Sequence, residues 1–142
     1  MSKDTLGIAD YPLAEKRPEL IEGHHGKRLA DLTMDAVLTG SVSMEDLRIT
    51  AKALRQQAEI ARAAGRPTLA DNFERSAELV AVPQEVIMRI YELLRPGRAR
   101  NPEQLMAAAG ELRNGHGALR MAAFVEEASA VYAKRGLFTR RY

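Results

Sequence analysis

Alanine and leucine dominate the apolar residues of this chain, and this constrains its fold more than any other feature of the sequence. The 142 residues include 23 alanines and 16 leucines, against seven valines and six isoleucines. Alanine and leucine are among the best helix formers, whereas β-branched residues are the ones that strands prefer. The sequence therefore predicts an all-α protein.

The overall composition excludes several kinds of chemistry. Hydrophobic residues make up 46% and charged residues 28% of the chain, which is typical of one globular domain of this length. Cysteine is absent, which excludes disulfides, a thiolate nucleophile and cysteine-ligated metals. The formal net charge of +2 is a weak field over 142 residues, so it indicates neither nucleic acid nor an anionic membrane as a partner.

The chain lacks the usual signals for a membrane or an export pathway. No stretch approaches the roughly 18 uninterrupted apolar residues that a spanning helix needs. The first residues, MSKDTLGIADYPL, contain no apolar core of a secretory signal. We therefore expect a cytoplasmic protein without a membrane partner.

Residues 1–31 show no helical or strand period. Prolines and glycines interrupt every candidate element, yet large apolar residues recur, which is unusual for a disordered tail. Those apolar residues are Tyr11, Leu13, Leu20, Ile21 and Leu29. The segment is either a frayed tail or an arm that lies on this domain or on another chain, and we predict an irregular N-terminal arm over residues 1–31.

Helix caps and helix breakers divide the rest of the chain. Two short helical turns are predicted at 34–38 and 43–49, and longer helices at 51–64, 67–80, 83–94, from 102 to a break at 114–117, and 118–135. The predicted caps are Thr33, Ser43 with Asp46, Thr50, and Asn101 with Gln104. These signals predict a small domain of about five to six helices over residues 32–142. Its inner stripes are rich in alanine, which buries little area, so we expect the core to be completed against a partner.

Candidate catalytic and metal-binding residues form no complete set. Glu22 and His25 have the Glu-x-x-His spacing of di-iron helix bundles, but glycines flank the histidines and no second such motif exists. Glu126 and Glu127 are adjacent and point about 100° apart on a helix. His116 lies in a glycine-rich break, and neither Gly-x-Ser-x-Gly nor a glycine-rich phosphate loop occurs. We expect no catalytic, cofactor-binding or metal-binding residue in this chain.

The two predicted helices within residues 51–80, joined around Gly65, Arg66 and Pro67, could form a helix-turn-helix. The would-be recognition helix presents outward residues with a net charge of −2, and DNA affinity requires cations. Those outward residues are Asp71, Asn72, Glu74, Arg75 and Glu78. The charge argues against nucleic-acid binding.

Several short strings occur along the chain in a characteristic order and spacing. They are DYPLA at 10–14, DLRIT at 46–50, NFER at 72–75 with AEL at 77–79 and VP at 82–83, IY at 90–91 with LRP at 94–96, and AAFV at 122–125 with EA at 127–128. Together they resemble the small (gamma) subunit of adenosylcobalamin-dependent diol dehydratase and glycerol dehydratase. The resemblance covers residues 10–135, nearly the whole chain, and the ordered set is more specific than any one string.

The resemblance implies a role within a larger enzyme. That enzyme is a dimer of three-subunit protomers that converts 1,2-propanediol or glycerol to an aldehyde by a radical mechanism. Its large subunit, a TIM barrel, holds the substrate and a metal ion, and the large and medium subunits hold the cobalamin. The small subunit is mostly helical, packs against the large subunit and supplies no catalytic group.

The resemblance also suggests which residues meet the partner. Tyr11, Pro12 and Leu13 are expected in an arm docked on the large subunit. Arg48 and Arg75 lie within the matched strings, and either a subunit contact or a surface ion pair fits them. Aromatic residues within the same strings are expected in the core, namely Phe73 and Tyr91.

Two departures and two alternatives accompany this resemblance. Glu126 stands where relatives often carry arginine, which puts an ion pair there in doubt. Only nine residues precede Asp10, which favours a freely cytoplasmic enzyme over one packaged in a microcompartment. The alternatives are a free-standing helical adaptor or nucleic-acid-binding module, and a small enzyme that uses Glu22 and His25.

Overall fold

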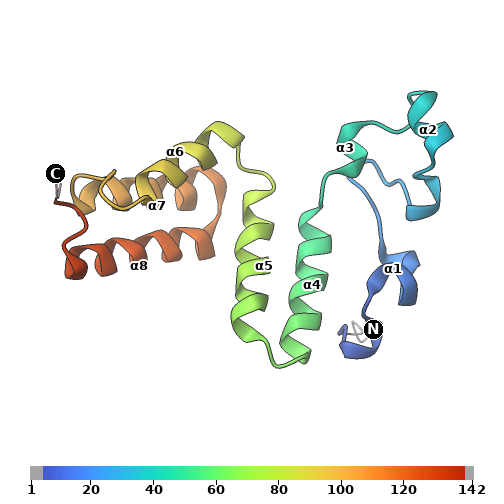
Figure 1. The fold of residues 1–142 in the computed structure, drawn as a ribbon, viewed down its shortest axis with the longest axis horizontal. Helices are drawn as coiled ribbons and strands as arrows, with labels where there is room; N and C mark the ends of the chain where they lie inside the picture. The colour runs from blue at the N-terminus through green and yellow to red at the C-terminus, as the bar shows by residue number, and fades with distance from the viewer. Residues whose placement is uncertain (1–4, 140–142) are drawn as a thin grey trace. The chain divides into compact units, whose positions relative to one another are not determined.

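The computed structural model describes residues 5–139, and within that range all regular structure is helical. Eight α-helices and three short 3₁₀ turns follow one another along residues 5–139, and the only β-type pairing among these residues is an isolated bridge between Glu22 and Arg28 (Figure 1). The prediction of an all-α protein is confirmed. The chain divides between Val80 and Ala81 into two compact units, which are described separately below.

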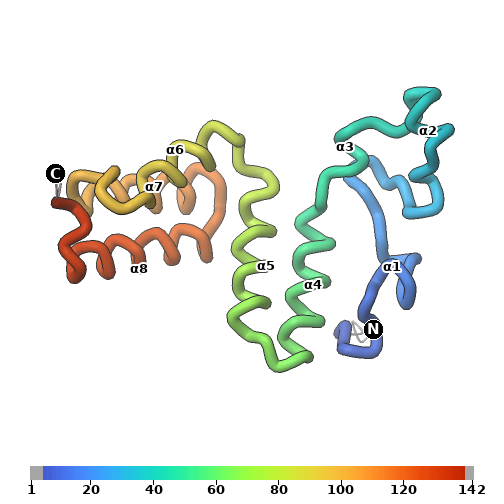
Figure 2. The backbone as a smooth tube through the Cα atoms, viewed as in Figure 1, coloured from blue at the N-terminus to red at the C-terminus, as the bar shows by residue number. Residues whose placement is uncertain are grey.

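The first unit is built on a helical hairpin. Helix α4 (Ala51–Ala63) and helix α5 (Pro67–Leu79) run side by side, joined by a tight turn at Gly65 (Figure 2). Gly65 has φ +71°, a left-handed conformation that a side chain would strain. Alanines let the two helices approach closely, and the half-buried Phe73 packs against them; these buried alanines are Ala58, Ala61 and Ala70.

The rest of the first unit consists of short turns. In chain order they are η1 (Ile8–Asp10), α1 (Leu13–Lys16), η2 (Pro18–Leu20), η3 (Leu29–Asp31), α2 (Met34–Leu38) and α3 (Met44–Leu47). Leu6 and Leu13 pack with Ile60 of α4, and Leu20 and Ile21 border this cluster. A segment without helical period is therefore held by a few apolar anchors. The predicted division at residue 31 stays a prediction.

The second unit contains the three remaining helices, α6 (Gln84–Leu94), α7 (Pro102–His116) and α8 (Leu119–Arg135). Helices α7 and α8 form a second hairpin, with Gly117 at φ +63° between them. The predicted interruption exists, but its predicted extent of 114–117 is wrong, because residues 114–116 still belong to α7 and the chain leaves the helix only at Gly117. The core of this unit contains larger fully buried side chains than the buried alanines between α4 and α5. Its fully buried large side chains are Leu105, Leu112 and Val125.

Most predicted helix ends are confirmed, because the caps are local. Thr50 Oγ1 accepts a hydrogen bond from the Ala53 N–H at 3.1 Å, and Ser43 and Asp46 form the predicted capping box. At α7 one detail differs, since Gln104 Oε1 accepts from the Arg100 N–H at 2.7 Å rather than from the cap residue itself.

Two further expectations are tested by the described residues. The prediction that Tyr91 lies in the core is wrong, because its side chain is 57% exposed on α6. Between residues 5 and 139, no helix has the length and apolarity needed to cross a lipid bilayer.

Candidate functional site

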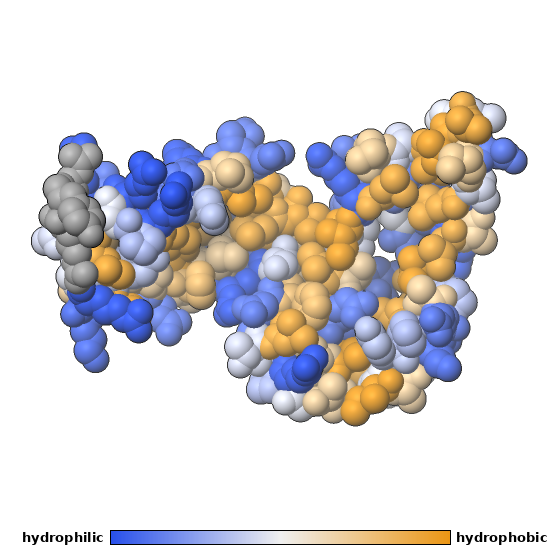
Figure 3. Space-filling view, viewed as in Figure 1, coloured by the Kyte–Doolittle hydropathy of each residue, from blue (hydrophilic) through white to orange (hydrophobic). Residues whose placement is uncertain are grey.

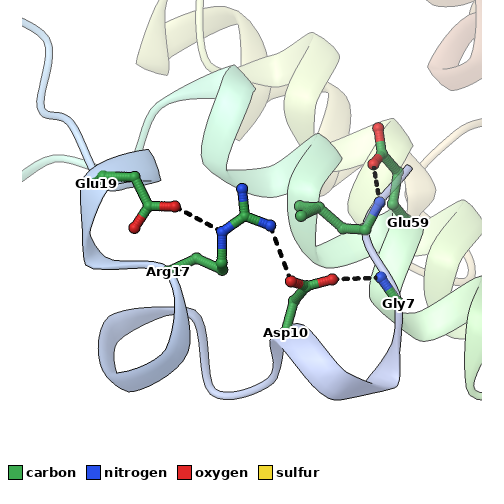
Figure 4. A network of polar contacts seen from close by, with 6 residues as sticks. Gly7, Asp10, Arg17, Glu19 and Glu59 are labelled. Atoms are coloured by element: carbon green, nitrogen blue, oxygen red, sulfur yellow. Dashed lines mark hydrogen bonds and ion pairs between the residues drawn. The ribbon is translucent and has the colours of Figure 1, made fainter. Parts of the chain in front are cut away.

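The N-terminal turns are tied to one another and to α4 by a polar network (Figure 4). The Leu6 N–H donates to Glu59 on α4 at 3.1 Å, and the Gly7 N–H donates to Asp10 at 2.9 Å. Arg17 then donates to Asp10 at 3.0 Å and to Glu19 at 2.6 Å. These bonds fix the path of the chain immediately before and after residues 11–13.

The carboxylates of this network are stabilised in their charged form. Hydrogen bonding from the Gly7 N–H, followed by that from Arg17, holds the pKa of Asp10 below its ordinary value. The hydrogen bond from Arg17 likewise lowers the pKa of Glu19. The network is therefore intact at neutral pH and weakens in acid.

The predicted contact residues of the arm lie in different environments. Tyr11 is 60% exposed, Pro12 is half-buried, and Leu13 is 5% exposed within the chain's own apolar cluster with Leu6 and Ile60. The Tyr11–Pro12 peptide bond is cis. Leu13 thus anchors the turn and Tyr11 is presented to solvent; the subunit-interface role of these residues stays a prediction.

A solvent-open hollow of about 570 Å³ lies beside the network. Arg17, Lys52, Arg55 and Glu59 contribute to its walls. Arg17 is already paired with two carboxylates, and the Lys52 ammonium lies 3.7 Å from Glu22. With two of its three cations engaged, the hollow offers little free positive charge to a small anionic ligand.

Glu22 and His25, the candidate metal pair, turn toward different partners. Glu22 faces Lys52, whereas His25 Nδ1 lies 2.9 Å from Oδ1 of Asp46 on α3. Within residues 5–139, no group of three ligating side chains is close enough to hold a metal ion. His116 ends α7 in the second unit.

Asp46 is a junction between the loop of residues 22–28 and α3. Its side chain is 3% exposed and accepts a hydrogen bond from the Ser43 N–H at 2.8 Å, as well as contacting His25. The Ser43 N–H is the main cause of a lowered pKa at Asp46, and His25 contributes. Gly23 packs so tightly here that a Cβ would lie 2.8 Å from the Asp46 carbonyl oxygen.

Two arginines of the matched strings, Arg48 and Arg75, lie on the surface of the first unit. Arg48 Nε is 3.4 Å from Glu45, and 66% of the Arg48 side chain is exposed. Arg75 is half-buried and donates to Asn72 one turn earlier on α5. Both geometries fit a surface interaction, and their predicted contact with another subunit stays a prediction.

Acidic residues of α5, the helix considered above for DNA recognition, form ion pairs within the chain itself. Arg62 of α4 donates to Glu74 at 2.8 Å and contacts Asp71 at 3.1 Å. These two contacts of one guanidinium group link α4 to α5.

Sequence reasoning missed a concentration of exposed apolar side chains between residues 29 and 49. Single apolar residues on a surface are normal, but a large cluster marks an interaction site. Figure 3 shows apolar atoms over the part of the chain labelled α2 and α3 in Figure 1. We call it the α2–α3 apolar surface, and its members are Leu29, Met34, Val37, Leu38, Met44, Leu47 and Ile49, which are 39–77% exposed.

Similarity to known proteins now decides the family. The sequence model of the family described as dehydratase small subunit matches residues 6–139. The chain belongs to this family. It is 50% identical over 134 residues to the propanediol dehydratase small subunit of Citrobacter freundii, covering 94% of this chain and 77% of the relative. It is 48% identical over 128 residues to the propanediol dehydratase small subunit of Salmonella typhimurium, covering 90% of this chain and 73% of the relative.

Membership of the dehydratase small subunit family confirms the resemblance to a dehydratase subunit. A small subunit implies other subunits as partners, and exposed apolar residues are typical of a chain that binds other subunits. The doubt about an ion pair at residue 126 is also settled, because Glu126 pairs with Arg113 across the α7–α8 hairpin. That arginine lowers the pKa of Glu126.

Proposed function

We propose that this chain is the noncatalytic small subunit of an adenosylcobalamin-dependent diol or glycerol dehydratase, and that it acts in assembly and stability of the holoenzyme. The observation that carries the proposal is the 50% identity, over 94% of the chain, to a propanediol dehydratase small subunit. The described surface adds support, because its unpartnered apolar residues suit a protein that works in a complex.

The holoenzyme we propose is a dimer of three-subunit protomers. A large TIM-barrel subunit holds the diol and, with a medium subunit, the cofactor. Adenosylcobalamin held there would supply the radical chemistry by which the diol is converted to an aldehyde and water. The residues of this chain take no part in that chemistry: Glu22 and His25 are occupied with Lys52 and Asp46.

Within that assembly, the predicted contacts remain part of the proposal. Tyr11, Pro12 and Leu13 form a turn docked on the large subunit, in which the buried Leu13 holds the exposed Tyr11 in place. Arg48 and Arg75 contribute at the same interface. The exposure of Tyr11 and Arg48 leaves both side chains accessible to a partner.

The test is co-expression of the tagged chain with the open reading frames beside its gene. The eluate is assayed with 1,2-propanediol and with glycerol, each with and without adenosylcobalamin. We expect a larger TIM-barrel chain and a medium chain to co-purify, with aldehyde formed only when the cofactor is present. The purified small chain alone is expected to be inactive.

Elution of a stable chain without partners would overturn the proposal and favour a free-standing adaptor. Salt-dependent retention of nucleic acid would point to the nucleic-acid-binding alternative. Turnover by the isolated chain, lost on His25→Ala, would favour a small enzyme. Fractionation of the native cells tests the location, and we expect the enzyme free in the cytoplasm rather than in a microcompartment.

A further inference from the structure

We infer that the α2–α3 apolar surface is the main docking surface of this chain, and that it inserts into an apolar hollow with a basic rim on another subunit of the dehydratase. The inference rests on the proposed function and deepens it, because it says which face meets the partner and what the partner's face must look like.

The first reason is that the segment has almost no core of its own. Of residues 29–49, only Val42 and Asp46 are buried. Large side chains are turned outward instead, with Met34, Leu38 and Met44 73–77% exposed. Several such side chains within one short segment offer apolar contact area to a partner. Methionine is enriched at interfaces because its flexible thioether fits irregular hollows.

The second reason is that the surface is held in shape without a core. Helices of four or five residues are unstable alone in water, so local bonds must fix α2 and α3. Thr33 Oγ1 accepts from the Ala36 N–H at 3.2 Å, and the Val42 N–H donates to the Ala36 carbonyl at 3.0 Å. The contact of His25 with Asp46 secures α3. A preformed surface loses less conformational entropy when it binds.

The third reason is the charge of the segment, which indicates what kind of partner binds it. Residues 29–49 carry four carboxylates and one arginine, a formal net charge of −3 in a chain whose total is +2. Asp31, Asp35 and Glu45 are exposed beside the apolar side chains. Asp46 is buried against His25, so the exposed charges are Asp31, Asp35, Glu45 and Arg48, a net of −2. Nucleic acid and anionic lipid would be repelled, and a second copy of the same surface would oppose like charge with like charge. A different protein chain with lysine or arginine around an apolar hollow fits, and a small subunit has such chains as partners.

The experiment compares two matched double variants in the co-expressed complex. Leu38→Asp with Met44→Asp changes the surface, and Met88→Asp with Met106→Asp changes two exposed methionines of the second unit, 50% and 48% exposed. We expect the first pair to reduce the co-purified large chain at least tenfold and the second to keep it within twofold of wild type. Circular dichroism of each purified variant checks that the helices are retained.

Hydrogen–deuterium exchange of the wild-type chain supplies a readout that needs no variant. Amides of residues 29–49 should exchange at least tenfold more slowly in the complex than in the free chain. Equal co-purification of both variants with wild type, or no added protection at 29–49, would overturn the inference while leaving the proposed function intact. If only the Met88 and Met106 pair reduced the co-purified large chain, the docking surface would lie on the second unit. If the wild-type chain formed a dimer with itself and the Leu38 and Met44 pair abolished that dimer, the partner would be a second copy of this chain. If wild type captures no larger chain, the proposed function itself fails.

Discussion

The His25 imidazole lies 2.9 Å from the Asp46 carboxylate, and this contact ties the loop of residues 22–28 to the first turn of α3. Asp46 is almost fully buried and also caps α3 through the Ser43 N–H, whereas 59% of the His25 side chain is exposed. One carboxylate therefore serves two elements, and its loss should release both.

We expect Asp46→Ala to lower the melting temperature more than His25→Ala does. The alanine leaves the Ser43 N–H without its acceptor and removes the partner of His25, whereas loss of the exposed imidazole removes one contact only. Thermal unfolding of the two single variants and the double variant measures this. If the stability losses of the two single variants simply add in the double variant, as they do for distant substitutions, the two side chains are not coupled.

The lowered pKa values predict how stability depends on pH. Asp10, Asp46 and Glu19 each have a folded-state pKa below the ordinary value of 3.8 for aspartate or 4.5 for glutamate. Such carboxylates stabilise the folded chain fully above those ordinary values, and the stabilisation is lost as the pH falls through the lower folded-state pKa.

Denaturant unfolding between pH 7 and pH 2 should therefore show stability declining below about pH 4. Asp46→Asn should make this decline shallower, because one titrating group has been removed. An unchanged slope would show that Asp46 does not contribute to acid sensitivity.

Gly23 predicts a steric effect. In Gly23→Ala the new methyl would lie 2.8 Å from the Asp46 carbonyl oxygen, and the backbone must move to relieve the clash. We expect a loss of about 1–3 kcal/mol in the free energy of unfolding. Gly110→Ala is the matched control: apart from its chain neighbours and the adjacent backbone of α7, no atom lies within 4 Å of the Cβ position, and in the interior of α7 alanine should stabilise by up to about 1 kcal/mol. Equal effects of the two substitutions would contradict the packing at Gly23.

Leu13 and Ile8 are a buried and an exposed apolar residue of the N-terminal turns, so substituting each shows whether burial holds these turns in place. Leu13→Ala should cost about 2–5 kcal/mol of unfolding free energy, because the side chain is buried against Leu6 and Ile60. Ile8→Ala, at a position 63% exposed, should change stability by less than about 0.5 kcal/mol. Urea unfolding monitored by circular dichroism distinguishes them. A small loss for Leu13→Ala would mean that the turn is not held by its apolar anchor.

Tyr11 tests the predicted arm contact directly. Tyr11→Ala should leave the stability of the free chain nearly unchanged and reduce the yield of co-purified large subunit several-fold, since a large exposed aromatic often contributes strongly at an interface. Unchanged yield would remove Tyr11 from the interface.

The helix ends could be predicted well because their causes lie within a few residues. The predicted helices 51–64 and 67–80 end within one residue of α4 and α5, since Thr50, Gly65 and Pro67 act locally. Tyr91 shows the limit of this reasoning. As an aromatic residue of the matched strings it is predicted to lie in the core, but only packing decides which residues are covered, and Tyr91 is left exposed.

The candidate surface shows the same division. The sequence marks Leu38 and Met44 as apolar residues in helical turns, and nothing local tells whether they are buried. Their exposure follows because no described part of the first unit, from residue 5 to residue 80, covers them. The pairing of His25 with Asp46 joins residues 21 positions apart, which no spacing rule predicts.

The sequence by itself determined the helical class, the caps and breaks, and the dehydratase small subunit family, because propensity, capping and ordered strings are local properties of the chain. The tertiary structure decided which apolar residues became core and which became surface. Burial depends on what packs over a side chain, and the segment from Leu29 to Ile49 finds almost nothing within its own unit to cover it.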